Sequence, residues 1–382
     1  MIIHLDWNQA SIDSDKVCAQ NGQAGDYVAW QPKELFYING LNVIEVEDGS
    51  DFKQIYGAQK FANTLNNGVP TAIVYKTIKG RKYGIEGRKS HGSGHKFASE
   101  GYYKALEEFE KTFGVQIPRF EGEMDAQNVE NYYYKTLMCF RYAIQKNSKI
   151  FSPFGLKLKS AQKRLLDKKL PALKKPQKTF DPYKLPEVLK YPADKKVALR
   201  SAMGAALQYM GEKQKSSFYV STADLSGSTS AGQIAKPYDK GFYNKQTNPE
   251  SRLIASGGIC EDGLSAVMSG VSAYGLNTGV AASYAAFTSS MMHTAARLHA
   301  IGQQVYSEVT KKPMNTFVIF SGHAGIPTGE DGPTHADPQA LQLVQEDFPK
   351  NMAITLTPLD AKDVWPSLVA AMAKKPAVLY PF

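Results

Sequence analysis

The chain has 382 residues, 43% of them hydrophobic, and a formal net charge of +9 at pH 7. This length allows large buried cores and indicates two domains rather than one. The three cysteines, Cys18, Cys139 and Cys260, have no metal-type CxxC spacing and argue for a reducing compartment. No stretch approaches the roughly 20 apolar residues of a membrane span and the first residues have no basic signal region, so we expect a cytoplasmic protein.

The positive charge is concentrated in residues 157–178, where lysines and arginines alternate with prolines and no aromatic residue is present. A net positive charge could serve nucleic acid, an anionic membrane surface or small anionic substrates. Nucleic-acid surfaces usually combine basic and aromatic side chains. This run therefore favours a solvated linker over a nucleic-acid site.

The first part of the chain alternates between strand-like and helix-like segments. Residues 4–8 (HLDWN) are typical of the end of a buried strand, 51–65 have helical spacing, and 70–77 (PTAIVYKT) form another strand. Such alternation predicts a parallel sheet covered by helices, with ligands at the carboxyl ends of the strands. The Gly-rich basic loop at 80–96 follows the last of these strands and is therefore placed to meet an anion.

A proline-rich connection separates this part from a second alternating region. Residues 100–169 are largely helical in pattern, whereas 170–192 contain too many prolines for regular structure. The segments predicted beyond it are a helix at 197–210, strands at 216–225 and 252–257, a helix at 263–274, a strand and a helix within 279–298, a strand at 316–322, a helix after 337, a strand at 352–359, a helix ending at 373 and a strand at 377–382.

These patterns predict two α/β domains, each a mostly parallel sheet flanked by helices. We place the first domain at 1–150, a basic proline-rich linker at 151–195 and the second domain at 196–382. The apolar segment 279–302 is interrupted by Ser, Thr, His and Arg, which favours a buried or interfacial helix over a membrane span.

The most specific string is GHAGIPTGEDGPTHADP at 322–338, which combines four glycines and three prolines with two histidines. With a histidine just after a strand and GEDGPTH downstream, it resembles the signature of transketolase and dihydroxyacetone synthase. Four further segments resemble the same family in order and spacing. They are DWNQASID at 6–13, RKSHG at 88–92, ADLSGST at 223–229 and SGGICEDGLSAVMSG at 256–270.

The resemblance implies two domains of the thiamine-diphosphate-binding fold: the second part of a diphosphate-binding domain at 1–150 and a pyrimidine-binding domain at 196–382. It implies a transferase of the pentose phosphate pathway, which moves a two-carbon ketol unit from a ketose phosphate to an aldose phosphate through the ylid of thiamine diphosphate. Measured against the family, we expect the first part of the diphosphate domain and the carboxyl-terminal domain to be absent from this chain.

By resemblance, Glu261 is the carboxylate that hydrogen-bonds the aminopyrimidine ring, and Tyr284 and Phe287 pack against that ring. From spacing alone Glu261 is an ordinary acid favoured at a helix start, and the two aromatic residues belong to a core. The matching segments around them favour the cofactor role.

The family binds the diphosphate through a divalent cation, Mg²⁺ or Ca²⁺. By resemblance Asn8 supplies a side-chain oxygen and Ala10 a main-chain carbonyl to the metal. The Gly-Asp-Gly motif that gives the first carboxylate in the family lies upstream of the position where this sequence begins, so the expected metal site is incomplete.

The remaining site residues also follow from the resemblance. His91 is expected near the diphosphate and the reacting centre, and Asp224 and Leu225 beside the cofactor rings. The expected substrate ligands are Arg200, Ser228, His323, Asp331 and His335, with both of these histidines as hydrogen-bond donors or proton shuttles. From the sequence alone, each histidine is equally well a neutral structural residue.

The family's cofactor lies between the diphosphate domain of one subunit and the pyrimidine domain of its mate, so the resemblance implies a homodimer. A second polypeptide that supplies the missing amino-terminal segment is also compatible with the sequence. Three alternatives stay open. They are a related thiamine enzyme of the dihydroxyacetone synthase or deoxyxylulose phosphate synthase type, a non-catalytic or partner-dependent subunit, and nucleic-acid binding by the linker.

Overall fold

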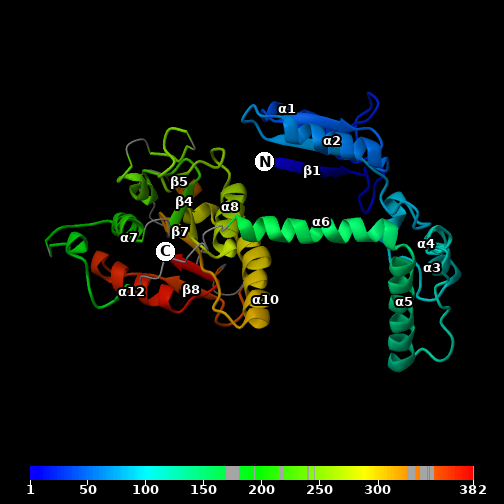
Figure 1. The fold of residues 1–382 in the computed structure, drawn as a ribbon. Helices are drawn as coiled ribbons and strands as arrows, with labels where there is room; N and C mark the ends of the chain where they lie inside the picture. Colours follow the sequence, from blue (N-terminus) through cyan, green and yellow to red (C-terminus); the bar gives the residue numbers. More distant parts are fainter. Residues whose placement is uncertain are drawn as a thin grey trace. The chain divides into compact units, whose positions relative to one another are not determined.

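The computed structural model describes residues 1–168, 180–192, 194–214, 218–238, 241–244, 246–324, 332–335, 342, 344 and 348–381. The chain divides into two compact units, Met1–Leu170 and Pro171–Phe382 (Figure 1). Each unit has its own sheet and its own core, and each is described separately below.

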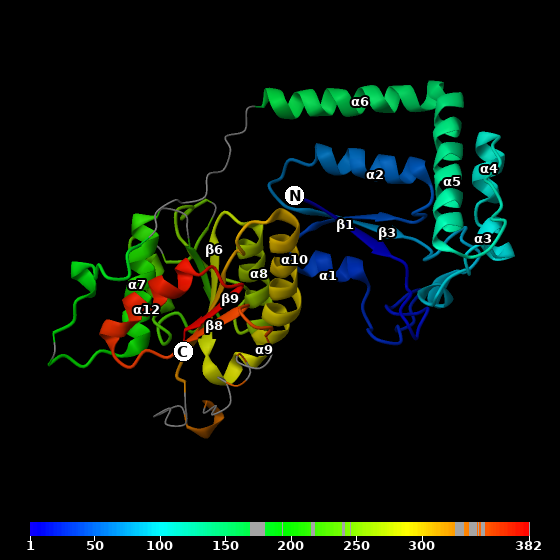
Figure 2. The ribbon, with the colours of Figure 1, turned by 90° about the horizontal axis from the view of Figure 1, so that it is seen from below.

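The first unit contains a three-stranded parallel sheet in the order β1-β3-β2. Its elements are β1 (Ile2–Trp7), α1 (Pro32–Ile38), β2 (Asn42–Val46), α2 (Phe52–Thr64) and β3 (Thr71–Lys76). The helices α1 and α2 lie on opposite faces of the sheet (Figure 2). The α2 face is apolar because Val46 and Ile73 pack against Ala58 and Ala62 of that helix. The Asp51 side chain begins α2 by accepting a hydrogen bond from the Lys53 amide.

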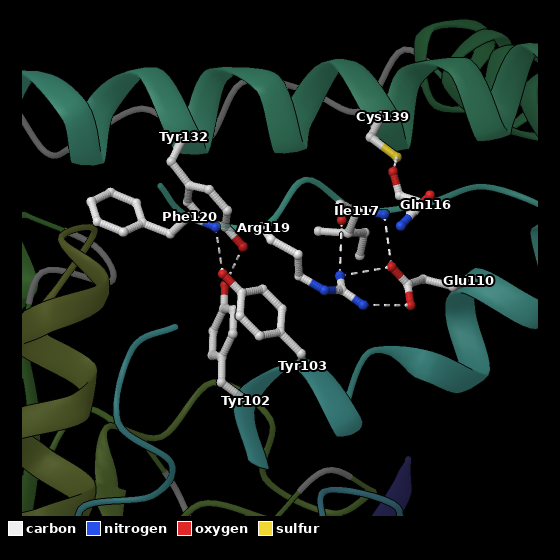
Figure 3. Close-up of polar contacts among 9 residues, drawn as sticks. All are labelled: Tyr102, Tyr103, Glu110, Gln116, Ile117, Arg119, Phe120, Tyr132 and Cys139. Atoms are coloured by element: carbon white, nitrogen blue, oxygen red, sulfur yellow. Dashed lines mark hydrogen bonds and ion pairs between the residues drawn. The ribbon is translucent and has the colours of Figure 1, made fainter. Parts of the chain in front are cut away.

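The other helices of the first unit are η1 (Gly87–His91), α3 (Glu100–Lys104), α4 (Glu107–Phe113), α5 (Ala126–Lys146) and α6 (Ser148–Asp167). Figure 3 shows the polar contacts beneath α5. Arg119 donates to both carboxylate oxygens of Glu110, at 2.9 and 3.2 Å, and its guanidinium lies 4.4 Å from the ring centroid of Tyr103. The hydrogen bonds from Arg119 lower the pKa of Glu110, so this carboxylate stays charged and holds α4 to the following loop.

The second unit is built on a six-stranded, fully parallel sheet in the order β5-β4-β6-β7-β9-β8. Its strands are β4 (Phe218–Thr222), β5 (Leu253–Ile254), β6 (Thr278–Tyr284), β7 (Phe317–Gly322), β8 (Ala353–Leu356) and β9 (Val378–Pro381). Its main helices are α7 (Leu199–Lys213), α8 (Glu261–Tyr274), α9 (Ser289–Met292), the π-helical segment η5 (His293–Ala300), α10 (Ile301–Thr310) and α12 (Ala361–Ala373). The short helices η2 (Glu187–Leu189), η3 (Ala231–Ala235), η4 (Ala285–Phe287) and η7 (Pro333–His335) complete it.

Alternating side chains of the strands feed two separate cores in this unit. In β7, Val318 and Phe320 join the core that contains α7 and α12, whereas Phe317 and Ile319 join the core that contains α8 and η5. Because successive side chains of a strand point to opposite faces, helices cover both faces of the sheet (Figure 1). The predicted fold class, parallel sheets flanked by helices, is therefore confirmed.

The structure also locates the segments whose pattern was ambiguous. The apolar stretch 279–302 contains β6, η4, α9, η5 and the start of α10, and within the described ranges no helix is long and apolar enough to cross a membrane. Helix α6 occupies the first part of the predicted linker 151–195, and residues 169–179 lie outside the description. The helix predicted after Asp337 falls mostly on undescribed residues.

An ionisable side chain, His299 of η5, is buried in the core that contains α8 and η5. His299 is 3% exposed, and its Nε2 lies 2.9 Å from the carbonyl oxygen of Asn315. Because that carbonyl can only accept, Nε2 carries the proton of the neutral ring. Burial lowers the pKa of His299, since the charged form loses its hydration.

This burial predicts a pH dependence of stability. As pH falls below the ordinary imidazole pKa of about 6.5, the unfolded chain gains a proton at His299 that the folded chain does not. The free energy of unfolding should therefore decrease toward acid, and in His299→Gln this decrease should be smaller. Urea unfolding between pH 5 and pH 8 measures the effect. The matched control is His293→Gln, an exposed residue of the same η5 segment, and equal slopes in the two variants would contradict the assignment.

Candidate active site

The carboxyl ends of three neighbouring strands carry most of the predicted site residues of the second unit. Asp224 follows β4, Tyr284 ends β6, and His323 follows β7. Asp224 and His323 adopt left-handed backbone conformations, with φ of 57° and 53°. Such conformations are uncommon for residues other than glycine and gather at functional sites. The predicted residues gathered here, two of them in this conformation, make this edge of the sheet the candidate site.

Glu261 is held by a hydroxyl of the adjacent strand. It is the first residue of α8, where the positive end of the helix dipole favours a carboxylate. Its Oε1 accepts a hydrogen bond of 2.9 Å from Oγ of Ser283, a fully buried residue of β6. This contact fixes one oxygen of the half-buried carboxylate and leaves the other for a ligand.

Four rings form an aromatic cluster at the ends of β6 and β7, namely Tyr284, Phe287, His323 and His335. His323 stacks on Tyr284 with ring centroids 4.2 Å apart. His335 meets Tyr284 and Phe287 edge-on, at 5.4 and 5.3 Å. Tyr284 and Phe287 lie at 21° to each other with centroids 6.3 Å apart. The sequence-predicted aromatic pair and two of the three predicted histidines are thus brought together.

Arg200 joins this cluster from the first turn of α7. Its exposed guanidinium lies 2.9 Å from Nε2 of His323. A guanidinium can only donate, so Nε2 must be the acceptor of the imidazole and Nδ1 carries the proton. The contact therefore fixes both the orientation and the tautomer of His323.

The loop after β4 carries the three other predicted residues of this unit that the structure describes. Asp224 is exposed, and Leu225 and Ser228 are half-buried. The loop is closed on itself, because the carbonyl of Leu225 accepts hydrogen bonds from the amide and the hydroxyl of Thr229, the latter at 2.6 Å. The methyl group of Thr229 lies beside Gly322, which places the loop next to the end of β7. Asp331, the remaining predicted ligand, lies outside the described residues.

Sequence reasoning missed the buried hydroxyls beneath this edge. Ser283 and Ser321 are paired in register on β6 and β7, and both are almost fully buried. Within the part of the chain that the structure describes, Oγ of Ser321 has no hydrogen-bond partner, and neither has Oγ1 of Thr222 at the end of β4. Buried hydroxyls without partners are rare and fit a site that takes a polar ligand. The sequence did contain a signal for these hydroxyls: each serine lies near the carboxyl end of an otherwise apolar strand.

The first unit contributes a separate set of predicted residues at the end of β1. Oδ1 of Asn8 accepts a hydrogen bond of 3.0 Å from the amide of Ala10. The Gln9 side chain bridges this turn to Cys18, donating to its carbonyl at 3.0 Å and accepting from its amide at 2.8 Å. A cavity of about 280 Å³ lies against the same turn. The turn that carries the proposed metal ligands is therefore fixed in place.

The RKSHG loop packs against the same region. The guanidinium of Arg88 donates to the carbonyl of Asp13 at 3.1 Å, and the backbone amide of Arg88 donates to the Asp15 side chain. His91 is exposed and contacts the ammonium group of Lys79. Predicted segments 6–13 and 88–92 are thus neighbours in the folded unit.

The residues at this turn fit a divalent cation only in part. Asn8 and Ala10 offer two neutral oxygens, and across the described residues no group of three or more His, Cys, Asp or Glu side chains could hold a metal ion. Mg²⁺ prefers six oxygen ligands and is often bound through few protein groups and the phosphates of its ligand. The negatively charged ligands of such an ion would therefore have to come from the diphosphate.

Comparison with known proteins points to one family. The family described as "Transketolase, pyrimidine binding domain" matches residues 195–380. Transketolase from Staphylococcus epidermidis is 28% identical over 340 residues, which cover 88% of this chain and 44% of that protein. This chain therefore spans less than half the length of that curated relative.

Solved transketolases are similar in fold to this chain. The structure from Leishmania mexicana has a TM-score of 0.67 at 19% identity, and that from Campylobacter jejuni has 0.63 at 21%. A Pichia stipitis transketolase in complex with sedoheptulose-7-phosphate has 0.62 at 20%. Each comparison covers all of this chain and about half of the other, at 50 to 51%. Residues 195–380 of the second unit thus match the transketolase pyrimidine-binding domain, in a chain that is similar to transketolases over most of its length.

Proposed function

We propose that this chain takes part in transketolase-type transfer of a two-carbon ketol unit from a ketose phosphate to an aldose phosphate, with thiamine diphosphate as cofactor. The observation that carries the proposal is the grouping of Glu261, the aromatic cluster and Arg200 at one edge of a transketolase pyrimidine-binding domain. An acid, flat apolar rings and a cation are the groups that an aminopyrimidine and a phosphorylated sugar require.

Thiamine diphosphate, when bound, supplies the carbanion chemistry of the reaction. The role of Glu261 is to bind a ring nitrogen of the aminopyrimidine through its carboxylate. Ser283 orients that carboxylate by holding Oε1 at 2.9 Å. A fixed carboxylate lowers the cost of placing a proton on the ring, because it need not be reorganised during the reaction.

The aromatic cluster would orient both cofactor and substrate. Tyr284 and Phe287 supply flat apolar surface against which the aminopyrimidine packs. Because Nε2 of His323 accepts from Arg200, the ring can donate from Nδ1 to a substrate oxygen, and His335 can act beside it. Asp331 and Ser228 stay proposed substrate ligands, as do Asp224 and Leu225 for the cofactor rings.

Arg200 is the proposed phosphate ligand of the donor or acceptor sugar. Its guanidinium is exposed at the mouth of the cluster and can pair two N–H groups with phosphate oxygens. Sedoheptulose-7-phosphate, present in the Pichia stipitis complex, carries the kind of phosphate group that this guanidinium could bind.

We further propose that the diphosphate is bound by the first unit of a second copy, through Asn8, Ala10 and His91, with Mg²⁺ or Ca²⁺. The support is that these residues lie on neighbouring segments held together by Arg88, with Asn8 fixed in a tight turn. A homodimer would then be the smallest functional assembly, and polypeptide outside this chain could complete the metal shell.

The first prediction concerns cofactor binding. Calorimetric titration with thiamine diphosphate and Mg²⁺ should show saturable binding that is weakened when Mg²⁺ is replaced by a chelator, because the oxygens of Asn8 and Ala10 can bind an anionic diphosphate only through a cation. Absence of saturable binding at millimolar cofactor would instead support a non-catalytic or partner-dependent subunit.

The second prediction concerns Glu261. In the cofactor-bound protein, Glu261→Ala should slow exchange of the cofactor's C2 proton with solvent deuterium by roughly 100-fold or more, with a modest loss of affinity. Quenched-flow NMR measures this exchange without a sugar substrate. The control is Asp262→Ala, the exposed neighbouring acid, which should exchange at the normal rate. Normal exchange in Glu261→Ala would remove that residue from its proposed role.

The third prediction concerns Arg200. Arg200→Ala should raise the KM for phosphorylated sugars by roughly tenfold, since a charged hydrogen bond to phosphate is lost, and should change the KM for unphosphorylated sugars much less. Steady-state assays with matched sugar pairs test this, with Arg297→Ala as an exposed arginine control. Equal changes for both sugar types would sink the phosphate assignment.

A further inference from the structure

A second cavity lies at the opposite edge of the second unit's sheet. Its volume is about 600 Å³, and it is lined where β4, β6 and β7 begin, by Phe218, Thr278 and Thr316. The candidate active site lies where these parallel strands end. Since a strand rises about 3.3 Å per residue, the five to seven residues of each strand separate the two places by roughly 20 Å. The cavity is therefore independent of the proposed catalytic site.

The walls of this cavity are largely apolar. Phe180, Met210, Phe218, Met314, Val369 and Met372 contribute the main apolar side chains. Three of the six are methionines, which adapt their shape to different ligands more readily than branched side chains do. A volume of this size is typical of pockets that bind small organic molecules. A sugar phosphate has no apolar body to fill such walls, so the cavity does not suit the proposed substrates.

The charged groups on the cavity lining are all positive. Lys312 and Lys375 line it, and no aspartate or glutamate does so among the described residues. Both lysines are exposed, and neither forms an ion pair with a described acidic side chain. They follow the carboxyl ends of α10 and α12, whose partial negative charge favours ammonium groups there. The cavity thus combines an apolar interior with two unneutralised cations at its border.

We propose that this cavity binds a small anionic amphiphile: a molecule with an acyl or aromatic body and a carboxylate, sulfonate or phosphate head. The body would lie against Met210, Phe218 and Met372, and the head would pair with Lys312 and Lys375. Apolar burial supplies most of the binding free energy, and the two lysines select the anionic head over a neutral or cationic one.

The test uses 8-anilinonaphthalene-1-sulfonate, a fluorescent anionic amphiphile, titrated into the whole folded chain. We expect one saturable class that decanoate displaces and the uncharged decanol displaces far less well. Lys312→Glu should weaken binding by roughly tenfold, because two units of charge change near the sulfonate. Lys362→Glu makes the same change of net charge at the other end of α12 and should leave binding unaltered.

A second variant tests the apolar interior separately. Ala373 lines the cavity at the exposed end of α12, so Ala373→Trp should occupy part of it and weaken binding without disturbing a buried contact. Unfolding midpoints of all variants identify any loss of folding. Binding that is unchanged in both Lys312→Glu and Ala373→Trp, or equal displacement by decanol and decanoate, would overturn the proposal. Neither readout requires thiamine diphosphate, so the result is independent of the proposed enzymatic function.

Discussion

The parallel alignment of β4, β6 and β7 is the constraint on which the rest of the second unit depends. Because these strands run in one direction, Asp224, Tyr284 and His323 reach the same edge although they are distant from one another in the sequence. The same alignment gathers the strand beginnings at the other edge, where a quite different cavity forms. The strand direction thus separates two sets of groups. Aromatic rings, a carboxylate and a guanidinium lie at one edge of the sheet, and apolar walls and ammonium groups lie at the other.

Much of this arrangement could be predicted from the sequence. The buried strands of the second unit are short apolar runs between helical segments, a pattern that local propensity and tertiary packing both favour. The grouping of Tyr284 with His335 was predicted through the resemblance of GEDGPTH to a known signature, not through periodicity. The turn at Asn8 and the RKSHG loop were likewise predicted as functional segments, and their adjacency through Arg88 emerged only in the fold.

Other features could not be predicted because they depend on contacts between distant residues. The helix α1 was not assigned, since seven residues are too short for a clear helical period, and the strand β2 was also missed. The bond from Ser283 to Glu261 joins residues 22 positions apart and requires the register of β6 against the start of α8. The tautomer of His323 follows from Arg200, which is 123 positions away. The cavity at the other edge is lined by residues from the ends of several helices and strands. Nothing in the sequence distinguishes its two lysines from other exposed lysines.

The left-handed backbone at Asp224 and His323 also limits what this edge can become. A β-branched or bulky side chain is strongly disfavoured at such φ values, whereas Gly, Asn, Asp and, less often, His are tolerated. The backbone therefore favours short polar side chains at these two positions, whichever ligand is bound. Descendants of this sequence could exchange a carboxylate for an amide here with little loss of folding, whereas a β-branched apolar residue would strain the turn that carries it.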